Sequence, residues 1–401
     1  MPSAGLGPSE TLRSDAELRR KGERGRDTGS VQRHVSGDLW STLWPSDARV
    51  VGGIPKTGGK DESPGSLSGG RGSAPGGRGA HGGVVGPIGR GPNLEGPNFS
   101  APVPAGGYAW WYVDALSDDG RFGLTVIAFI GSVFSPYYAW SGRTDPLNHC
   151  ALNIALYGAS GRRWAMTERG RSSLRREPGA LSIGPSTLTW EDDVLTIRFD
   201  EVTAPIPARV RGVVRLRPKA MLSQGFVLAA CGRHVWRPIA PRADVEAELE
   251  LPACSWRGEG YFDTNCGDEP LEDGFSSWEW SRAHLKRDTL VFYDVLGRDG
   301  GLSRLAMRID PRGDLTPIEP LSLRRLPSTR WRMARNIPAE ASSMPRVRET
   351  LEDTPFYSRS MIEGRYEGEL ATIIHESLSL DRLRSSLVRA MLPFRMPRAF
   401  Q

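Results

Sequence analysis

The strongest constraint on the fold is a pattern that begins at Gly106. From there the chain is a series of short segments of alternating or β-branched character, separated by Gly, Asp, Asn and Pro. Segments 109–116 and 123–132 flank the sequence Ser-Asp-Asp-Gly at 117–120, a good hairpin turn. Apolar residues occupy every second position of 245–251. Short strands at this spacing are typical of barrels and sandwiches rather than βαβ units, so we expect an all-β protein.

The glycine distribution divides the chain into two parts. Residues 1–107 hold 25 of the 47 glycines, whereas ten of the twelve tryptophans follow residue 107. Such a polar, Gly-rich segment cannot bury enough apolar surface to offset its ordering entropy, so we expect residues 1–105 to be disordered. About 290 all-β residues more often make two domains than one. We therefore expect β domains at 106–250 and 251–398.

Charge and cysteine content exclude several classes of protein. From residue 106 on, 39 Lys and Arg oppose 37 Asp and Glu, which argues against a large nucleic-acid-binding face. No apolar run reaches the length of a transmembrane helix, and the first ten residues do not resemble a secretion signal. The four cysteines include no C-x-x-C pair and favour neither a disulfide framework nor a metal site. A reducing, cytoplasmic compartment is therefore the default.

The end of the chain predicts a short helix over residues 378–391. Four apolar side chains fall on one face at helical spacing: Leu380, Leu383, Leu387 and Met391. Three basic side chains occupy other positions: Arg382, Arg384 and Arg389. A basic amphipathic tail suits a membrane surface. The alternative is a helix that covers one end of a barrel, with its arginines solvated.

Two strand-like segments place polar groups beside aromatic rings. Residues two apart on a strand share a face, so His234 lies beside Trp236, and Tyr261 lies beside Asp263. Burial against aromatic rings raises the pKa of a carboxyl group, which can then stay protonated near neutrality and act as an acid. Aromatic faces nearby would stabilise a cation formed by protonation. Asp263 is therefore the candidate acid, although it could instead be a turn residue.

Weaker candidates for the same cavity come from earlier in the chain. Trp110, Tyr112 and Asp114 share one face of a segment that is rich in aromatic residues, and His149 is a further candidate. A cavity lined in this way would suit a large apolar ligand. The alternative is that the aromatic side chains are ordinary core residues and that each histidine is a structural hydrogen-bonding residue.

At these residues the chain resembles the acyclic carotenoid 1,2-hydratases, also called hydroxyneurosporene synthases. The resemblance rests on segments 107–120 (GYAWWYVDALSDDG), 134–140 (FSPYYAW), 145–158 (DPLNHCALNIALYG), 234–243 (HVWRPIAPRA), 258–283 (GEGYFDTNCGDEPLEDGFSSWEWSRA) and 391–398 (MLPFRMPR). It covers about 94–398 and implies nothing for 1–93. The chain departs from the pattern at Cys266, where an aromatic residue is expected, so one wall of the site could differ.

The resemblance implies a fold, a substrate and a reaction. The fold would be two lipocalin-like β-barrel domains packed together. The enzyme would be a hydro-lyase of carotenoid biosynthesis, in the spirilloxanthin pathway of a photosynthetic bacterium. It would add water to the carbon 1–carbon 2 double bond of acyclic carotenoids such as neurosporene or lycopene, without a cofactor or a metal. Its location would be peripheral, on the inner or photosynthetic membrane.

Roles for the site residues follow from this reaction. Asp263 would protonate carbon 2, while Tyr261 and Trp236 would shape the pocket and stabilise the cation. His234 would hydrogen-bond the acid, or position the water and accept its proton. The alternative function is a non-catalytic lipocalin-like carrier of carotenoids or other isoprenoids, which needs no acid. A third possibility is an isoprenoid cyclase, which uses the same acid but captures the cation with an alkene.

Overall fold

The computed structural model describes residues 87–88, 96–158, 161–229 and 231–399. The disorder expected for most of residues 1–105 therefore lies outside the described residues. Within them, strands dominate and helices are short, which confirms the all-β expectation. No helix among the described residues is long and apolar enough to cross a membrane.

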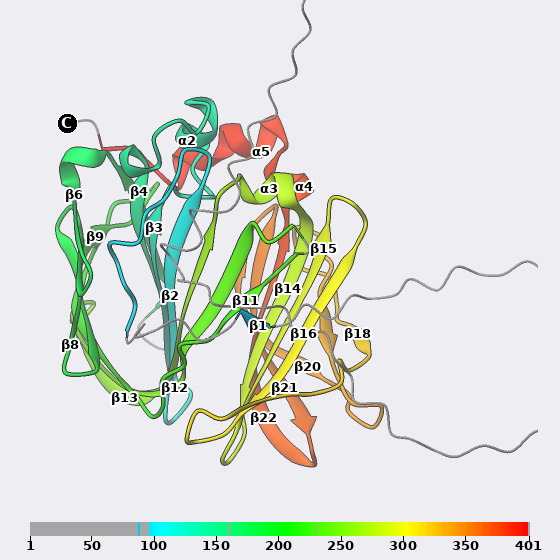
Figure 1. Ribbon diagram of the computed structural model, residues 1–401. Helices are drawn as coiled ribbons and strands as arrows, with labels where there is room; N and C mark the ends of the chain where they lie inside the picture. The colour runs from blue at the N-terminus through cyan, green and yellow to red at the C-terminus, as the bar shows by residue number, and fades with distance from the viewer. Residues whose placement is uncertain (1–86, 89–95, 159–160, 230, 400–401) are drawn as a thin grey trace, which may run out of the picture.

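The first sheet curls into a nearly closed antiparallel barrel (Figure 1). Eleven of its 13 strands follow the order β5-β4-β3-β2-β13-β12-β10-β9-β8-β7-β6. Its strands are β1 (Pro87–Ile88), β2 (Tyr108–Ser117), β3 (Phe122–Ile130), β4 (Cys150–Gly158), β5 (Arg163–Arg169), β6 (Leu174–Glu177), β7 (Ala180–Ile183), β8 (Ser186–Glu191), β9 (Val194–Val202), β10 (Arg209–Pro218), β11 (Gly225–Val227), β12 (His234–Leu251) and β13 (Cys254–Gly267). Near the open seam, Arg169 of β5 donates to Glu201 of β9 at 2.7 Å.

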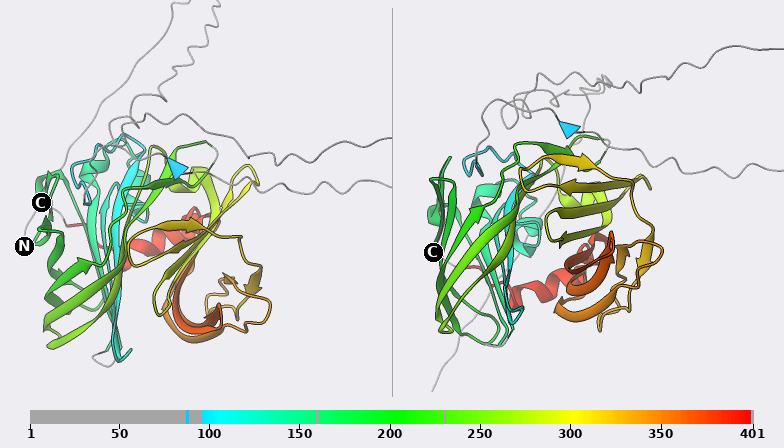
Figure 2. Two further views of the ribbon diagram at one scale, coloured as in Figure 1. Left: turned by 60° about the horizontal axis from the view of Figure 1, so that its bottom comes forward. Right: turned by 90° about the horizontal axis from the view of Figure 1, so that it is seen from below.

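The second sheet has seven strands in the order β17-β16-β15-β14-β22-β21-β20. These are β14 (Phe275–His284), β15 (Thr289–Gly297), β16 (Leu302–Ile309), β17 (Leu315–Pro317), β20 (Arg346–Asp353), β21 (Tyr357–Tyr366) and β22 (Glu369–Ser379), with β18 (Leu323–Arg325) and β19 (Asn336–Pro338) as a separate pair. Figure 2 shows this sheet curving beside the barrel. The described fold is thus one nearly closed barrel and a second curved sheet.

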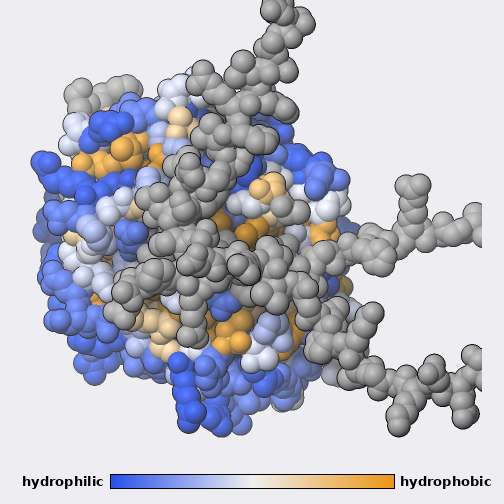
Figure 3. Space-filling model, viewed as in Figure 1, coloured by the Kyte–Doolittle hydropathy of each residue, from blue (hydrophilic) through white to orange (hydrophobic). Residues whose placement is uncertain are grey.

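Alternation on the central strands separates two cores. Trp111, Val113 and Phe262 point into the barrel, whereas Tyr112 and Tyr261 point out of it toward the second sheet. Both faces of β2 are consequently buried, because the period of a strand is two and each face meets a packed layer. Figure 3 shows a largely hydrophilic surface on this face, with separate hydrophobic patches, one of them over the upper part of the barrel.

The domain boundary expected near residue 250 is wrong. Residue 250 lies at the end of β12, and β12 pairs with β13 inside the first sheet, from His234 opposite Gly267 to Leu249 opposite Cys254. The chain changes sheets only between Gly267 and Phe275, through the short helix α3 (Leu271–Gly274). The turn at 252–253 is a hairpin within one sheet, and turn chemistry alone does not distinguish such a hairpin from a domain junction.

Disorder up to residue 105 is also wrong for residues 96–105. Phe99 is fully buried, and the Trp111 indole nitrogen donates to the Pro97 carbonyl at 2.9 Å. The Arg176 side chain donates to the Phe99 carbonyl at 2.7 Å. These residues pack on the barrel through contacts with distant strands, and a composition argument cannot detect contacts of that kind.

The C-terminal helix is shorter and more broken than the periodicity predicts. Strand β22 runs to Ser379, and the helical segments are α4 (Leu380–Leu383), α5 (Ser386–Met391) and the 3₁₀ turn at Leu392–Phe394. Leu380 and Leu383 are buried, but Leu387 is 70% exposed. In Figures 1 and 2 these segments lie across one end of the junction between the barrel and the second sheet.

The tail arginines are not simply solvated. Arg382 donates to the main-chain carbonyls of Trp331 and Pro355, at 2.8 and 3.1 Å. Arg389 donates to the buried carboxylate of Glu272 at 2.8 Å. These side chains therefore fasten the tail to loops of the second sheet and to α3, and Leu387 and Phe394 are among the residues it exposes.

Candidate active site

The candidate acid lies between the two sheets, outside the barrel interior. Asp263 is on β13, next to β12 and β2, whose outward faces pack against β14 and β15. Every second residue of these strands faces the second sheet, so Tyr261 lies on the same side as Asp263, and Trp110 on the same side as Tyr112. The face-sharing expected from the sequence is confirmed.

Asp263 has one oxygen held and one oxygen free. The residue is 3% exposed. Its Oδ2 accepts hydrogen bonds from the Trp236 indole nitrogen and from the Tyr261 hydroxyl, both at 2.8 Å. Its Oδ1 makes no hydrogen bond to any residue that the structure describes. The free oxygen is therefore the atom on which a proton can be carried and delivered.

Burial raises the pKa of Asp263 well above its ordinary value, although the hydrogen bonds from Trp236 and Tyr261 oppose this rise. The carboxylates of Glu376 and Asp114 raise the pKa further. The neutral carboxylic acid is thus favoured in the folded protein, because its charged form would be buried away from water. Such a group is poised to act as a general acid.

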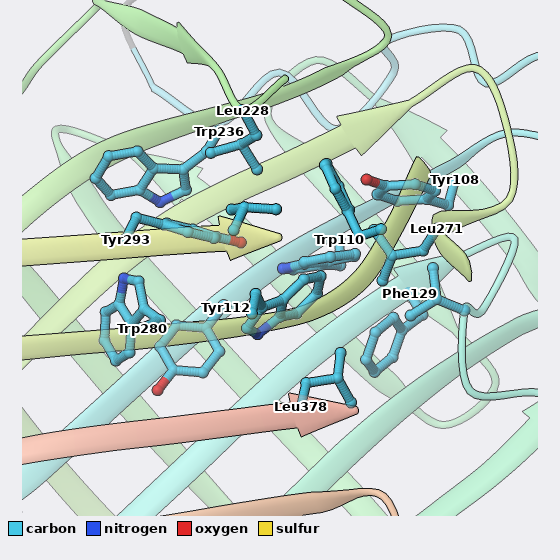
Figure 4. Packing of buried hydrophobic residues seen from close by; sticks show 14 of the residues in the cluster. Tyr108, Trp110, Tyr112, Phe129, Leu228, Trp236, Leu271, Trp280, Tyr293 and Leu378 are labelled. Atoms are coloured by element: carbon cyan, nitrogen blue, oxygen red, sulfur yellow. The ribbon is translucent and has the colours of Figure 1, made fainter. Parts of the chain in front are cut away.

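Five aromatic rings surround this carboxyl group, and we call them the aromatic cage. They are Tyr112, Trp236, Tyr261, Trp280 and Tyr293. Figure 4 labels four of them, Tyr112, Trp236, Trp280 and Tyr293, between the two sheets. The rings of Tyr261 and Trp280 are 5.2 Å apart, and those of Trp236 and Tyr293 are 5.4 Å apart. Their faces carry negative potential and can stabilise a cation formed inside the cage. Trp280 and Tyr293 come from the second sheet and were not among the residues predicted from the sequence.

Trp280 contributes a second unsatisfied atom to the cage. The residue is 4% exposed, and its indole nitrogen has no hydrogen-bond partner among the described residues. A buried donor without a partner costs free energy unless a small polar molecule satisfies it. The cage therefore offers a free donor at Trp280 as well as the free oxygen of Asp263.

His234 does not hydrogen-bond the candidate acid, which was the first of its two predicted roles. Its Nδ1 bonds the Tyr108 hydroxyl and its Nε2 bonds the Glu269 carboxylate, both at 2.9 Å. The strand register is the reason, because His234 lies opposite Gly267, four residues along β13 from Asp263. Both ring nitrogens are therefore engaged at that end of the strand, away from Asp263.

Tyr112 and Asp114 belong to a buried polar network that joins the sheets. The Tyr112 hydroxyl donates to Asp114 at 2.9 Å and accepts from Arg359, which also pairs with Glu376. Arg282 of β14 donates from Nε to the Asp114 carboxylate at 2.8 Å. Asp114 is therefore an ion-pair partner, and its charge is balanced.

The sequence analysis gave no role to the second-sheet members of this network. Arg282 lies in segment 258–283, which carries the family resemblance, shortly after the tryptophans at 278 and 280. Nothing in the local sequence marks Arg359 or Glu376.

The predicted pocket residue His149 lies elsewhere. Its Nδ1 is 2.7 Å from Glu168 and its Nε2 is 3.1 Å from Ser141. Arg398 of the chain end contacts both His149 and Glu168, which fastens the C-terminus to β5. His149 lies just before β4, is engaged in this separate cluster and does not line the inner cavity described below.

A small apolar cavity, the inner cavity, lies beside the cage. It measures about 80 Å³, and Trp110 and Tyr112 are among its lining residues. One row of paired residues crosses the sheet from Asp263 through Tyr112, Ile127 and Asn153 to Met166, and the last four of these line the inner cavity. The inner cavity is therefore next to the acid, with the Tyr112 side chain between them.

The departure at Cys266 does not change the cage. Cys266 lies opposite Val235 and Ala109 and packs in the barrel interior, on the other face of β13 from Asp263.

Among the described residues, no group of three or more His, Cys, Asp or Glu side chains is placed to hold a metal ion.

Comparison with known proteins gives a family match and relatives that are described as carotenoid hydratases. Residues 126–401 match the family described as carotenoid hydratase CrtC. The chain is 51% identical over 396 residues to the acyclic carotenoid 1,2-hydratase of Thiocapsa roseopersicina, covering 98% of this chain and 96% of that protein. It is 48% identical over 378 residues to the enzyme of the same name from Rubrivivax gelatinosus, covering 93% of each chain.

A third relative carries the same name and comes from Cereibacter sphaeroides. It is 40% identical over 274 residues, which cover 68% of this chain and 98% of that protein. The Thiocapsa match is long enough to extend into residues 1–93, beyond the reach of the motif resemblance.

Proposed function

The chain belongs to the carotenoid hydratase CrtC family, and we propose that it is an acyclic carotenoid 1,2-hydratase. This hydro-lyase adds water across the terminal carbon 1–carbon 2 double bond and gives a tertiary alcohol at carbon 1. One observation supports the mechanism most strongly. The Asp263 carboxyl group is buried in an aromatic cage, with Oδ2 hydrogen-bonded to Trp236 and Tyr261 and Oδ1 without a hydrogen-bond partner among the described residues.

In the first step, Asp263 transfers its proton from Oδ1 to carbon 2. The new carbon–hydrogen bond takes the electron pair of the double bond and leaves a tertiary cation at carbon 1. The hydrogen bonds from Trp236 and Tyr261 to Oδ2 stabilise the carboxylate that forms. The faces of Tyr112 and Trp280 stabilise the cation.

In the second step, water attacks carbon 1 and returns a proton to the Asp263 carboxylate. The cycle then closes with one water consumed, and no base other than Asp263 is needed. The Trp280 indole nitrogen donates a hydrogen bond to one lone pair of the water oxygen and so holds the water in place. The second lone pair of the same oxygen attacks carbon 1. Because the cage is buried, few other waters compete for the cation.

Replacing Trp280 with Phe tests the position of the water. The ring face remains, but the donor is lost, so we expect hydration to fall about fivefold, the effect of one hydrogen bond. In heavy water, the cation formed in the variant should lose a proton and return to substrate more often than in wild type. The amount of deuterated substrate recovered, relative to the amount of hydrated product, should therefore rise. Mass spectrometry measures this ratio. Trp256→Phe on the barrel side is the control, and an equal ratio in both variants would contradict the assignment.

The function itself is tested by incubating the purified protein with lycopene in liposomes. We expect a product heavier by one water, detected by chromatography and mass spectrometry. Bound pigment without product would favour the carrier, and a product of unchanged mass would favour the cyclase. Either result would overturn the proposed activity.

The proposed location is the surface of the inner or photosynthetic membrane. The substrate is apolar and dissolves in lipid, and the tail exposes Leu387 and Phe394, at 70% and 72%. Exposed apolar side chains on a short helical segment suit the membrane interface. Flotation of the same liposomes checks this, because an enzyme that stays at the bottom of the gradient is not a peripheral membrane protein.

We also propose that both sheets are lipocalin-like units. Each has an apolar core of its own, around Val126 and Ile154 in the barrel and around Phe292 and Ile362 in the second sheet. The cage then lies between two such units rather than inside either one.

A further inference from the structure

A surface groove adjoins the inner cavity and is nearly ten times as large. It measures about 780 Å³, against about 80 Å³ for the inner cavity. Its walls come from the β4–β5 hairpin, the β9–β10 loop, residues 330–331, the end of β20 and Arg395. Trp164, Glu352 and Thr354 line both spaces, so these side chains form the partition between them.

The lining of the surface groove is unusual for a water-exposed surface. Ile206 is 80% exposed and Trp331 is 48% exposed, and both lie in the groove with Leu351 and Pro205. Large apolar side chains gathered in a hollow mark a site for an apolar ligand. The groove adjoins the inner cavity, which in turn lies next to the acid behind Tyr112, so a ligand in the groove could reach toward the reacting centre.

The arginines of the groove suit a conjugated chain. The Arg395 guanidinium lies 4.5 Å from the centre of the Trp164 ring, on its face. Planar guanidinium groups stack on π systems, and a polyene presents such a face along its length. The positive charge is partly compensated, because Glu352 and Asp353 also line the groove and Arg162 pairs with Glu349 at 2.6 Å. Arg163 and Arg330 also line the groove, so its lining keeps an excess of positive charge, and it is the apolar side chains that favour a neutral chain.

We propose that the surface groove binds the polyene chain of the substrate while its end passes Trp164 and enters the inner cavity. The proposal rests on the proposed function. The inner cavity is too small for more than the end of such a chain, so the rest needs an apolar surface continuous with it. Trp164 and Arg395 then form the gate between the bound chain and the reacting end.

Chain length tests this inference. The substrates are lycopene in detergent and a ten-carbon acyclic isoprenoid alcohol with the same terminal double bond, which reaches only the inner cavity. For Ile206→Asp and Trp331→Ala we expect the KM for lycopene to rise about tenfold, since each loses apolar contact with the chain. The KM for the short substrate and both kcat values should stay unchanged. Leu302→Asp, at a 42% exposed residue outside the groove, is the matched control.

Binding without turnover gives a second readout. The same groove variants made in an Asp263→Asn background should retain less lycopene absorbance on gel filtration than Asp263→Asn alone. An unchanged KM for lycopene, or an equal rise for both substrates, would overturn the inference. So would a loss confined to binding of anionic liposomes, which would identify a headgroup site. If wild type hydrates lycopene but the variants do not differ, only this inference fails; if wild type forms no product, the proposed function fails.

Discussion

Asp263→Asn is expected to lower the kcat of carotenoid hydration by about three orders of magnitude, within the range of general acid catalysis. The amide oxygen can still accept hydrogen bonds from Trp236 and Tyr261, so the cage should keep its shape. The amide nitrogen cannot supply a proton of the required acidity. Product formation from lycopene under single-turnover conditions measures the loss directly.

The same substitution is expected to preserve stability, with a characteristic dependence on pH. Burial raises the folded-state pKa of Asp263 above the unfolded value of about 3.9. The group therefore contributes stability that is fully present below pH ~3.9 and is lost as pH rises through the folded-state pKa. Asn does not ionise, so Asp263→Asn should be at least as stable as wild type at neutral pH and gain relative to it as pH rises. Urea unfolding at several pH values measures the difference.

Wild-type activity should follow the same titration. The protonated acid is the active form, so hydration should hold at low pH and fall as pH rises through the raised pKa of Asp263. Activity that instead appears only as pH rises would indicate a carboxylate base.

Asp294→Asn is the matched control for Asp263→Asn. Asp294 is also buried, at 5% exposed, but it pairs with Arg304 at 2.7 Å in the second sheet and takes no part in the cage. We expect this variant to lose stability, because Arg304 loses its partner, and to keep turnover within a few-fold. Full turnover by Asp263→Asn would show that the acid is misassigned, and a large loss in both variants would point to folding.

From the sequence, strand periodicity predicts which residues of a single strand share a face, and this part of the site was predictable. A period of two places Tyr261 beside Asp263 and Trp110 beside Tyr112, and the structure keeps both pairs. Periodicity does not set register between strands, which is why His234 was expected at the acid but lies opposite Gly267. It also does not say which faces of two sheets will meet, so Trp280 and Tyr293 could not be assigned.

The limits of the fold prediction have the same origin. The alternation at 245–251 correctly indicates a strand, yet only its pairing with β13 shows that residue 250 lies inside the first sheet. The apolar spacing at 380–391 indicates a helix, but β22 extends to Ser379 because its pairing with β14 reaches that residue. Phe99 is buried by strands far along the chain, which its Gly- and Pro-rich neighbourhood does not reveal.

Arg282→Met is expected to destabilise the protein by about 3–5 kcal/mol, the usual effect of removing one partner of a buried ion pair. Arg282 and Asp114 are 2% and 1% exposed, and they join β14 of the second sheet to β2 of the barrel. Without Arg282, the Asp114 carboxylate keeps a hydrogen bond from Tyr112 but no charged partner there. Urea unfolding measures the loss. Arg209→Met, which breaks an exposed pair with Asp200, is the control and should leave the unfolding midpoint near that of wild type.

A double-mutant cycle separates the pair from its surroundings. If the loss in Arg282→Met comes from the stranded charge of Asp114, then adding Asp114→Leu should recover part of it, because no buried charge then remains. If the losses of unfolding free energy in the two single variants simply add, the two side chains do not interact. If Arg282→Met loses no more than Arg209→Met, the pair does not hold the sheets together. The cage is built from both sheets, so hydration in the single variant should fall together with its stability and return with it in the double variant. Recovery of stability without recovery of hydration would instead assign Arg282 a direct part in shaping the cage.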